Sequence, residues 1–190
     1  MNRIKWSQIS LNLGICFVVA LGLAAPSLRA DERRPMTFMD VMEMRTVGSG
    51  SISPDGKFVL YTVSIPQWKA GKNYTDIFVA AADGLAPPRQ MTFTKEKNET
   101  QPQWARSSRL IGFLSDREGS NQLYLMALDG GEARKISDAK DGVNAFAFSR
   151  DGKWVAFSAG KPEARQIWIV ALEKEDSPVQ LTKHATSVGT

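Results

Sequence analysis

The sequence predicts an all-β protein, and three observations support this fold class. One pattern, an apolar residue followed by a turn, a basic residue and an apolar run, recurs at residues 52–61, 104–113 and 148–157. The apolar runs are short, rich in β-branched and aromatic residues, and bounded by Asp-Gly or other glycine-containing turns, as in strands joined by tight turns. Runs such as 154–157 are apolar at successive positions, so both faces of the strand need cover.

The N-terminus has the order of a secretory signal peptide. Residues 1–12 contain Arg3 and Lys5 and no acidic residue, 13–23 are almost wholly apolar, and 24–30 are turn-prone and end in Ala30. The apolar run is too short to cross a hydrocarbon core of about 30 Å. Residues 1–30 are therefore predicted to be a signal peptide that is cleaved after Ala30. The mature chain is expected in the periplasm or outside the cell, without stable membrane insertion.

Cys16 lies inside the apolar run of the predicted signal. A lipid-anchor signal would need a small residue just before the cysteine, but Ile15 occupies that position. Loss of Cys16 with the cleaved signal is the simpler interpretation.

A short helix is predicted in the lead-in segment 31–48. Phe38, Val41 and Met42 follow a helical spacing, and Thr37 precedes them as a possible N-cap.

Three units of about 45 residues follow the lead-in. Each ends on an apolar residue followed by Thr or Ser, at 91–92, 136–137 and 181–182, with 45 residues between successive pairs. In the third unit we expect strands at 145–149, 154–158, 166–172 and 179–182.

A repeated four-stranded sheet that is covered on both faces is a β-propeller blade. We predict a partial β-propeller of three blades, at 49–95, 96–140 and 141–190, the last including the start of a missing blade. A β-sandwich with chance internal similarity is the alternative.

Three blades are fewer than the roughly four to eight that close a propeller. The sequence is therefore expected to be an incomplete piece of a longer protein, with Trp154, Phe157, Ile167 and Ile169 partly bare on the third blade. The alternative is a module in which two or more copies complete a ring.

Charge and cysteine usage exclude several classes of function. The sequence has 24 basic and 20 acidic residues, and three of the basic ones lie in the predicted signal, so the mature chain is close to neutral. A basic surface for nucleic acid therefore has little support. One Cys and one His cannot build a disulfide framework or a structural zinc site.

The sequence offers no serine-hydrolase nucleophile. No G-x-S-x-G occurs, and the nearest approach, around Ser187, is followed by neither a helix nor a His. His184 is interpreted as a solvated residue at a strand end. No catalytic residue is assigned.

No metal or cofactor site is predicted. Asp138, Asp141 and Asn144 lack the acidic ladder of a calcium loop, so an inter-blade turn is the simpler interpretation. Asp-Gly pairs are what tight turns require, because Gly tolerates a positive φ. These pairs begin at Asp55, Asp83, Asp129, Asp141 and Asp151.

The tryptophans are interpreted as core residues rather than a sugar-binding surface. Trp104, Trp154 and Trp168 occupy predicted strand positions that should be buried between blades, and Trp68 lies outside them.

A loop at 66–74 lengthens the central hairpin of the first blade, where it could form a rim contact, a lid or a plain solvent loop. Asn73 and Asn98 fit the N-glycosylation pattern in predicted loops.

Two motifs carry a resemblance to known repeats. Residues 53–57, Ser-Pro-Asp-Gly-Lys, and 149–153, Ser-Arg-Asp-Gly-Lys, resemble TolB-like, WD-type propeller repeats. Residues 112–117, 122–125 and 130–134 are similar to the N-terminal propeller of the prolyl oligopeptidase family, particularly its acylaminoacyl-peptidase-like branch. The resemblance covers residues 37–190, with a departure at 105–108.

The resemblance implies a propeller that restricts the access of peptides to a C-terminal α/β-hydrolase domain. Ser, Asp and His of such a domain match no position here. The leading hypothesis is the non-catalytic propeller segment of an exported serine peptidase, with a peptide substrate or protein partner and that hydrolase domain as partners. A periplasmic TolB-like binding propeller without an enzyme domain is the alternative.

Overall fold

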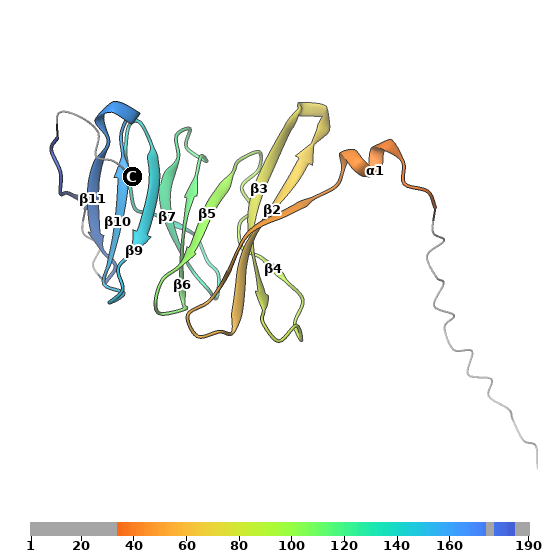
Figure 1. The fold of residues 1–190 in the computed structure, drawn as a ribbon, viewed down its shortest axis with the longest axis horizontal. Coiled ribbons are helices and arrows are strands. Elements are labelled where there is room, and N and C mark those ends of the chain that lie inside the picture. The colour runs from red at the N-terminus through yellow and green to blue at the C-terminus, as the bar shows by residue number, and fades with distance from the viewer. Residues whose placement is uncertain (1–33, 174–176, 185–190) are drawn as a thin grey trace, which may run out of the picture. The chain divides into compact units, whose positions relative to one another are not determined.

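The computed structural model describes residues 34–173 and 177–184, and contains three four-stranded antiparallel sheets and one short α-helix (Figure 1). The predicted signal peptide with Cys16 and the Ser187 segment lie outside the described residues. No helix within 34–173 and 177–184 is long and apolar enough to span a bilayer. The predicted all-β partial propeller is confirmed.

The lead-in helix α1 spans Phe38–Met42. Thr37 and Asp40 form a capping box, in which the Asp40 N–H donates to Thr37 Oγ1 at 3.3 Å and the Thr37 N–H donates to Asp40 Oδ2 at 2.6 Å. None of the helix residues is buried, so the helix is stabilised by its cap rather than by packing.

Within each sheet the strands pair in the order of the sequence. The first blade contains β1 (Thr46–Ile52), β2 (Phe58–Gln67), β3 (Lys72–Ala81) and β4 (Arg89–Gln90). The second contains β5 (Glu99–Trp104), β6 (Leu110–Ser115), β7 (Gln122–Ala127) and β8 (Arg134–Lys135). The third contains β9 (Val143–Phe148), β10 (Trp154–Ala159), β11 (Gln166–Ala171) and β12 (Val179–Gln180).

The Ser-x-Asp-Gly-Lys motif closes the turn between the first two strands of a blade. In the first blade the Ser53 hydroxyl donates to Asp55 Oδ1 at 2.6 Å, and the Lys57 N–H donates to the same oxygen at 3.2 Å. Gly56 has a φ of 73°, which a glycine adopts without strain. The corresponding bonds at Ser149 and Asp151 measure 2.5 and 3.0 Å, so the motif is a turn element, as predicted.

The second blade departs from this motif at a position that contacts its neighbour. Ser108 stands where the other turns have Gly, with a φ of 57°. Its hydroxyl oxygen accepts the Asp55 N–H at 3.0 Å. This bond joins the turns of the first two blades. It offsets the cost of placing Ser108, a residue other than glycine, in a left-handed backbone conformation.

The hydrophobic core lies between the blades. One cluster joins the first and second blades and contains Leu60, Ile77, Ile111 and Phe113, all almost fully buried. A second cluster joins the second and third blades and contains Leu114, Leu123, Leu125, Val155 and Phe157. The middle blade is therefore covered on both faces, as strands that are apolar at successive positions require.

The third blade corrects part of the sequence prediction. Trp154 is 41% exposed, and Ile167 and Ile169 are half-buried, as expected for a face without a neighbour. Phe157, also predicted to be partly bare, is only 3% exposed, because it points toward the second blade and stacks on Trp168. The prediction that Trp154 is buried between blades is wrong, because this residue lies on the face of the third blade that no neighbouring blade covers.

The predicted loop 66–74 is mostly strand. β2 continues to Gln67 and β3 begins at Lys72, with the short 3-10 helix η1 (Trp68–Ala70) between them. Both strands have ten residues, whereas β6 and β10 have six. The first blade therefore carries an extended hairpin that forms one wall of the site described below.

Candidate functional site

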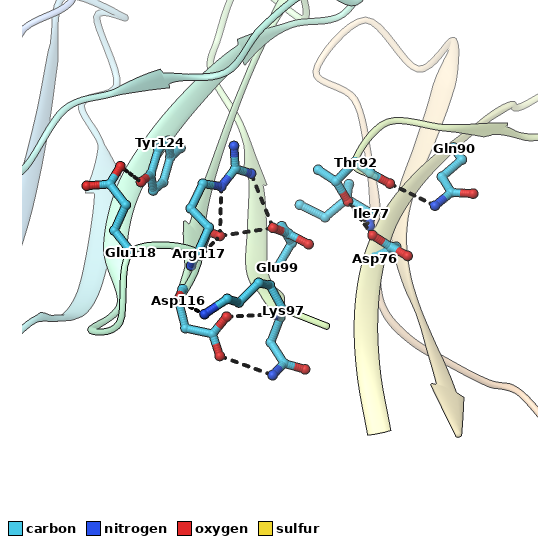
Figure 2. Close-up of polar contacts among 12 residues, drawn as sticks. Asp76, Ile77, Gln90, Thr92, Lys97, Glu99, Asp116, Arg117, Glu118 and Tyr124 are labelled. Carbon is cyan, nitrogen blue, oxygen red and sulfur yellow. Dashed lines mark hydrogen bonds and ion pairs between the residues drawn. The ribbon is translucent and has the colours of Figure 1, made fainter. Parts of the chain in front are cut away.

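The candidate site lies at the junction of the first and second blades, where β3, the link from β4 to β5, and the end of β6 meet (Figure 2). It contains a set of hydrogen bonds, here called the clasp, that joins the third strand of each blade to the link after the fourth strand. A hydroxyl after the fourth strand accepts an N–H of the third strand at 2.9 Å each time. The pairs are Thr92 with Ile77, Ser137 with Leu123, and Thr182 with Ile167.

Glutamine completes the clasp in the second and third blades. The Ser137 hydroxyl donates to Gln122 Oε1 at 2.7 Å, and this oxygen also accepts the Ala139 N–H at 3.0 Å. The Gln122 amide group donates to the Ala139 carbonyl at 2.7 Å. Gln166 repeats this arrangement with Thr182 and the backbone of His184. One amide side chain thus bonds both the backbone N–H and the carbonyl of one residue, Ala139 or His184, in the link after the fourth strand.

The first blade carries Asp76 at the glutamine position. The Thr92 hydroxyl donates to Asp76 Oδ1 at 3.1 Å, as its counterparts do to glutamine. The counterpart of Ala139 and His184 is Thr94, to which the shorter Asp76 side chain makes no hydrogen bond in the described part of the chain. Burial raises the pKa of Asp76, against the lowering effect of the Thr92 bond.

Glu99 lies next to this carboxylate and is fully buried at the start of β5. Its Oε1 accepts hydrogen bonds from the Ser115 hydroxyl at 2.9 Å and from Arg117 Nη2 at 3.2 Å, whereas Oε2 has no hydrogen-bond partner within residues 34–173 and 177–184. Burial raises the pKa of Glu99, the hydroxyls of Ser115 and Thr94 and the Arg117 charge oppose that rise, and the Asp76 charge adds to it.

Arg117 is held by aromatic rings as well as by Glu99. Its guanidinium lies 4.4 Å from the ring centroid of Tyr124 and 5.7 Å from that of Phe113. The Tyr124 hydroxyl donates to Glu118 Oε1 at 2.7 Å, and burial together with this carboxylate raises the pKa of Tyr124 to about 12. Arg117 is therefore positioned on Glu99.

Asp116 fixes the link that precedes β5. The Asn98 N–H donates to Asp116 Oδ1 at 2.8 Å, and the Asn98 side-chain amide donates to Oδ2 at 3.2 Å. The predicted loop placement of the two glycosylation sites is wrong, because Asn73 lies in β3 and Asn98 is half-buried in a bridge with Thr75. The Asn98 nitrogen that would carry a glycan is engaged in this bond.

A pocket of about 350 Å³ opens beside Asp76. The extended hairpin supplies Ile65, Gln67 and Tyr74, the fourth strand supplies Gln90, and residues 93–96 of the link close the other side. Ile65, Tyr74 and Phe93 thus offer apolar surface beside a half-buried carboxylate in a lining that is otherwise polar, an arrangement that can bind a charged group on an apolar stem.

The residues considered as catalytic or metal-binding candidates lie elsewhere. His184 is exposed after β12, and its backbone N–H and carbonyl bond Gln166. Asp138 is exposed and pairs with Lys135 at 2.7 Å, and Asp141 is exposed in a turn. Within residues 34–173 and 177–184, no group of three or more His, Cys, Asp or Glu side chains is placed to hold a metal ion.

The tryptophans do not form a common surface. Trp104 packs against the core between the first two blades, and its indole N–H donates to the Ser51 carbonyl at 3.2 Å. Trp168 packs against the core of the second and third blades. Trp68 is exposed at the hairpin tip with Lys69 over its ring, far along the chain from exposed Trp154.

Sequence reasoning missed Asp76, Glu99 and Arg117. Two of them were detectable as breaks in the repeat. Asp76 stands where the other units have Gln122 and Gln166, and Glu99 stands where the third unit has Val143, with the same cross-strand partner position. Arg117 lies in the turn between β6 and β7, whereas the corresponding links of the first and third blades contain short 3-10 helices, at Trp68–Ala70 and Pro162–Ala164, so the alignment carries no signal for it.

A model of the family described as the dipeptidyl peptidase IV (DPP IV) N-terminal region matches residues 85–188. The chain is 34% identical over 158 residues to dipeptidyl-peptidase 5 of Porphyromonas gingivalis, covering 83% of this chain and 22% of that protein. It is 32% identical over 156 residues to the uncharacterized peptidase YuxL of Bacillus subtilis, covering 78% and 23%. The chain therefore spans about a fifth of the length of the curated relatives it matches.

Solved structures show the same fold at lower identity. TolB from Acinetobacter baumannii superposes with a TM-score of 0.54 at 22% identity, over 71% of this chain and 32% of that one. The β-propeller domain of the trilobed protease from Pyrococcus furiosus gives a TM-score of 0.56 at 16% identity, over 73% of this chain and 44% of that one.

Proposed function

The chain belongs to the family of the dipeptidyl peptidase IV N-terminal region, and on this premise we propose that it is a non-catalytic propeller segment of an exported serine peptidase. In this role it gates the access of peptides to a C-terminal hydrolase domain. The observation that carries the proposal is the family match, which spans the second and third blades and their shared core.

The contacts within the chain support a scaffold role. Each blade is joined to the next by an apolar cluster, and the inner strands are bonded across blades, as when Gln103 Nε2 donates to the Phe146 carbonyl at 3.0 Å. His184, the one histidine in the sequence, is exposed and uses its backbone to close a clasp. Catalysis is accordingly assigned to a separate domain of the peptidase.

A second candidate function is a periplasmic TolB-like binding propeller without an enzyme domain. The structural similarity to TolB favours it, although that similarity shows the fold alone. Peptidase relatives that are more than 30% identical in sequence favour the first candidate.

The two candidate functions predict a different size and a different reactivity for the native protein that contains this chain. An antibody raised against the recombinant chain is used to isolate the native antigen, which is sized and labelled with a fluorophosphonate probe. A peptidase segment predicts an antigen much larger than 20.9 kDa that takes the label, with a mature N-terminus at Asp31. An unlabelled antigen of six or seven blades supports the binding propeller instead.

A further inference from the structure

We propose that the pocket beside Asp76 binds a basic side chain, lysine or arginine, of a peptide that reaches the propeller; this inference rests on the proposed function. Asp76 would anchor the positive charge, and the walls of the pocket would cover the methylene stem.

The first argument is the break in the clasp. Gln122 and Gln166 each hold both backbone groups of the following link, and Asp76 holds neither. The first blade therefore lacks the side-chain hydrogen bonds to the backbone N–H and to the carbonyl of the link, and it has a half-buried carboxylate at this position. A buried charge costs free energy unless it is paired, and Asp76 forms no ion pair in the described part of the chain. A cationic ligand would supply the missing partner.

The second argument is the composition of the pocket. Ile65 and Tyr74 of the hairpin and Phe93 of the link present apolar surface beside the carboxylate. Long basic side chains bury their methylene stems on such surface and keep the charged head on a polar partner. The volume of about 350 Å³ falls within the range of ligand pockets.

The third argument is the sign of the local charge. Lys95 and Glu96 at the rim are exposed and carry opposite charges. Arg117 is already committed to Glu99 Oε1 and to the Tyr124 ring, so the charges of Glu99 and Arg117 compensate each other and Arg117 leaves Asp76 unpaired. Within the described residues the Asp76 carboxylate is therefore a negative charge without an ion-pair partner on the interior side of the pocket, which favours a cation over an anionic or neutral group.

The binding test is a titration of the full chain, uniformly labelled with 15N, with acetylated and amidated tripeptides whose central residue is Lys, Arg, norleucine or Glu. We expect the Lys and Arg peptides to shift the amide signals of Tyr74 and Thr94 and to saturate. The norleucine peptide should bind at least about tenfold more weakly. Equal binding of norleucine, or no saturable shift with Lys and Arg, overturns the proposal.

The free amino terminus of a peptide is a second source of a positive charge. A norleucine tripeptide with an unblocked amino terminus separates the two sources. Binding as tight as that of the blocked Lys peptide would overturn the assignment to a basic side chain.

Asp76→Gln tests the anchor without removing the clasp. Glutamine is the residue that the other blades use here, so the variant should fold, with a thermal transition at or above that of the wild type. Its affinity for the Lys peptide should fall at least about tenfold. Glu132→Gln is the matched control, because it removes a charge of the same sign from an exposed residue that does not line the pocket, and it should change affinity by less than about threefold. Equal losses in the two variants, or none in Asp76→Gln, contradict the anchor.

The result does not depend on the peptidase assignment. The titration needs no catalysis, so an antigen that takes no fluorophosphonate label refutes the proposed function and leaves the measured affinity intact. Conversely, absence of binding refutes the pocket assignment and leaves the labelling result intact.

Discussion

At the scale of single residues, the second blade holds a buried ion pair close to Asp76 of the first blade. Glu99 is fully buried and bonds Arg117 at 3.2 Å, while the Arg117 side chain is only 22% exposed and lies on the Tyr124 ring. The pair is tolerated because Ser115 and Arg117 both bond the same carboxylate oxygen. Losing either charge alone would leave the other uncompensated.

Arg117→Met should therefore destabilise the chain by about 3 to 5 kcal/mol at neutral pH, because it leaves Glu99 buried and unpaired. Urea unfolding measures the change. Lys135→Met is the control, since Lys135 pairs with exposed Glu118 and Asp138, and its loss should cost no more than about 1 kcal/mol. A similar loss in both variants would show that burial of Glu99 is unimportant.

Asp76 should make stability depend on pH in a definite direction. Burial raises its folded-state pKa above 3.8, so the folded chain binds this proton more tightly than the unfolded chain does. The free energy of unfolding therefore falls as pH rises from the unfolded value through the folded one. The stability gained by Asp76→Gln should be larger at about pH 7 than at about pH 4, as measured by urea unfolding at both values.

Asp55→Asn is the control, because the pKa of Asp55 is lowered whereas that of Asp76 is raised. The Ser53 hydroxyl and the Lys57 N–H lower the pKa of Asp55, so its contribution is present above 3.8 and is lost as pH falls through the folded value. This variant should lose more stability at about pH 7 than at about pH 2.5, because the contribution of Asp55 is lost only below 3.8. A pH-independent difference in either variant contradicts the assignment.

At the scale of strands, the packing of one blade on the next requires a glycine in β6. A Cβ atom at Gly112 would lie 2.8 Å from atoms of Phe146 and of Phe148 in β9. The aromatic side chains of the third blade occupy the space that a side chain at this position would need. The equivalent positions in the other blades, Leu60 and Ala156, carry side chains.

Gly112→Ala should cost about 1 to 3 kcal/mol, because the two rings must move to admit the methyl group. Gly50→Ala in β1 is the matched control, since a Cβ there meets no atom within 4 Å. It should change stability by no more than about 0.5 kcal/mol in the same unfolding experiment. A neutral Gly112→Ala would mean that the blades separate more easily than the packing indicates.

At the scale of the whole molecule, stability depends on which blade faces are covered. Ile77, Leu123 and Ile167 occupy the same position in successive blades. Ile77 is 1% exposed and Leu123 is fully buried, because the next blade covers each of them, whereas Ile167 is half-buried. The same substitution should therefore have different consequences in different blades.

Ile77→Ala should destabilise the chain by about 2 to 5 kcal/mol, as removal of a buried isoleucine does. Ile167→Ala should cost clearly less, and it should also lower the binding of a hydrophobic dye to the uncovered face. Urea unfolding and dye fluorescence of both variants test this difference. Equal costs would indicate that the third blade has a neighbour in solution.

Local signals were enough to predict the repeat, the turns and most strand positions. The third-unit strands expected at 154–158 and 166–172 are observed at Trp154–Ala159 and Gln166–Ala171, because β-branched runs and Asp-Gly turns act over a few residues. The helix after Thr37 followed from its cap in the same way.

Tertiary structure alone decided which face of a strand is covered and which carboxylates meet. Phe157 and Trp154 share a strand, yet one is buried and the other exposed, because only one face of the third blade has a neighbour. Asp76 of β3, Glu99 of β5 and Arg117 of the turn after β6 are brought together, and the raised pKa values of Asp76 and Glu99 arise from burial that no local pattern encodes. Short-range apolar runs and turns therefore specify the blades, whereas the site exists only because the blades pack against one another.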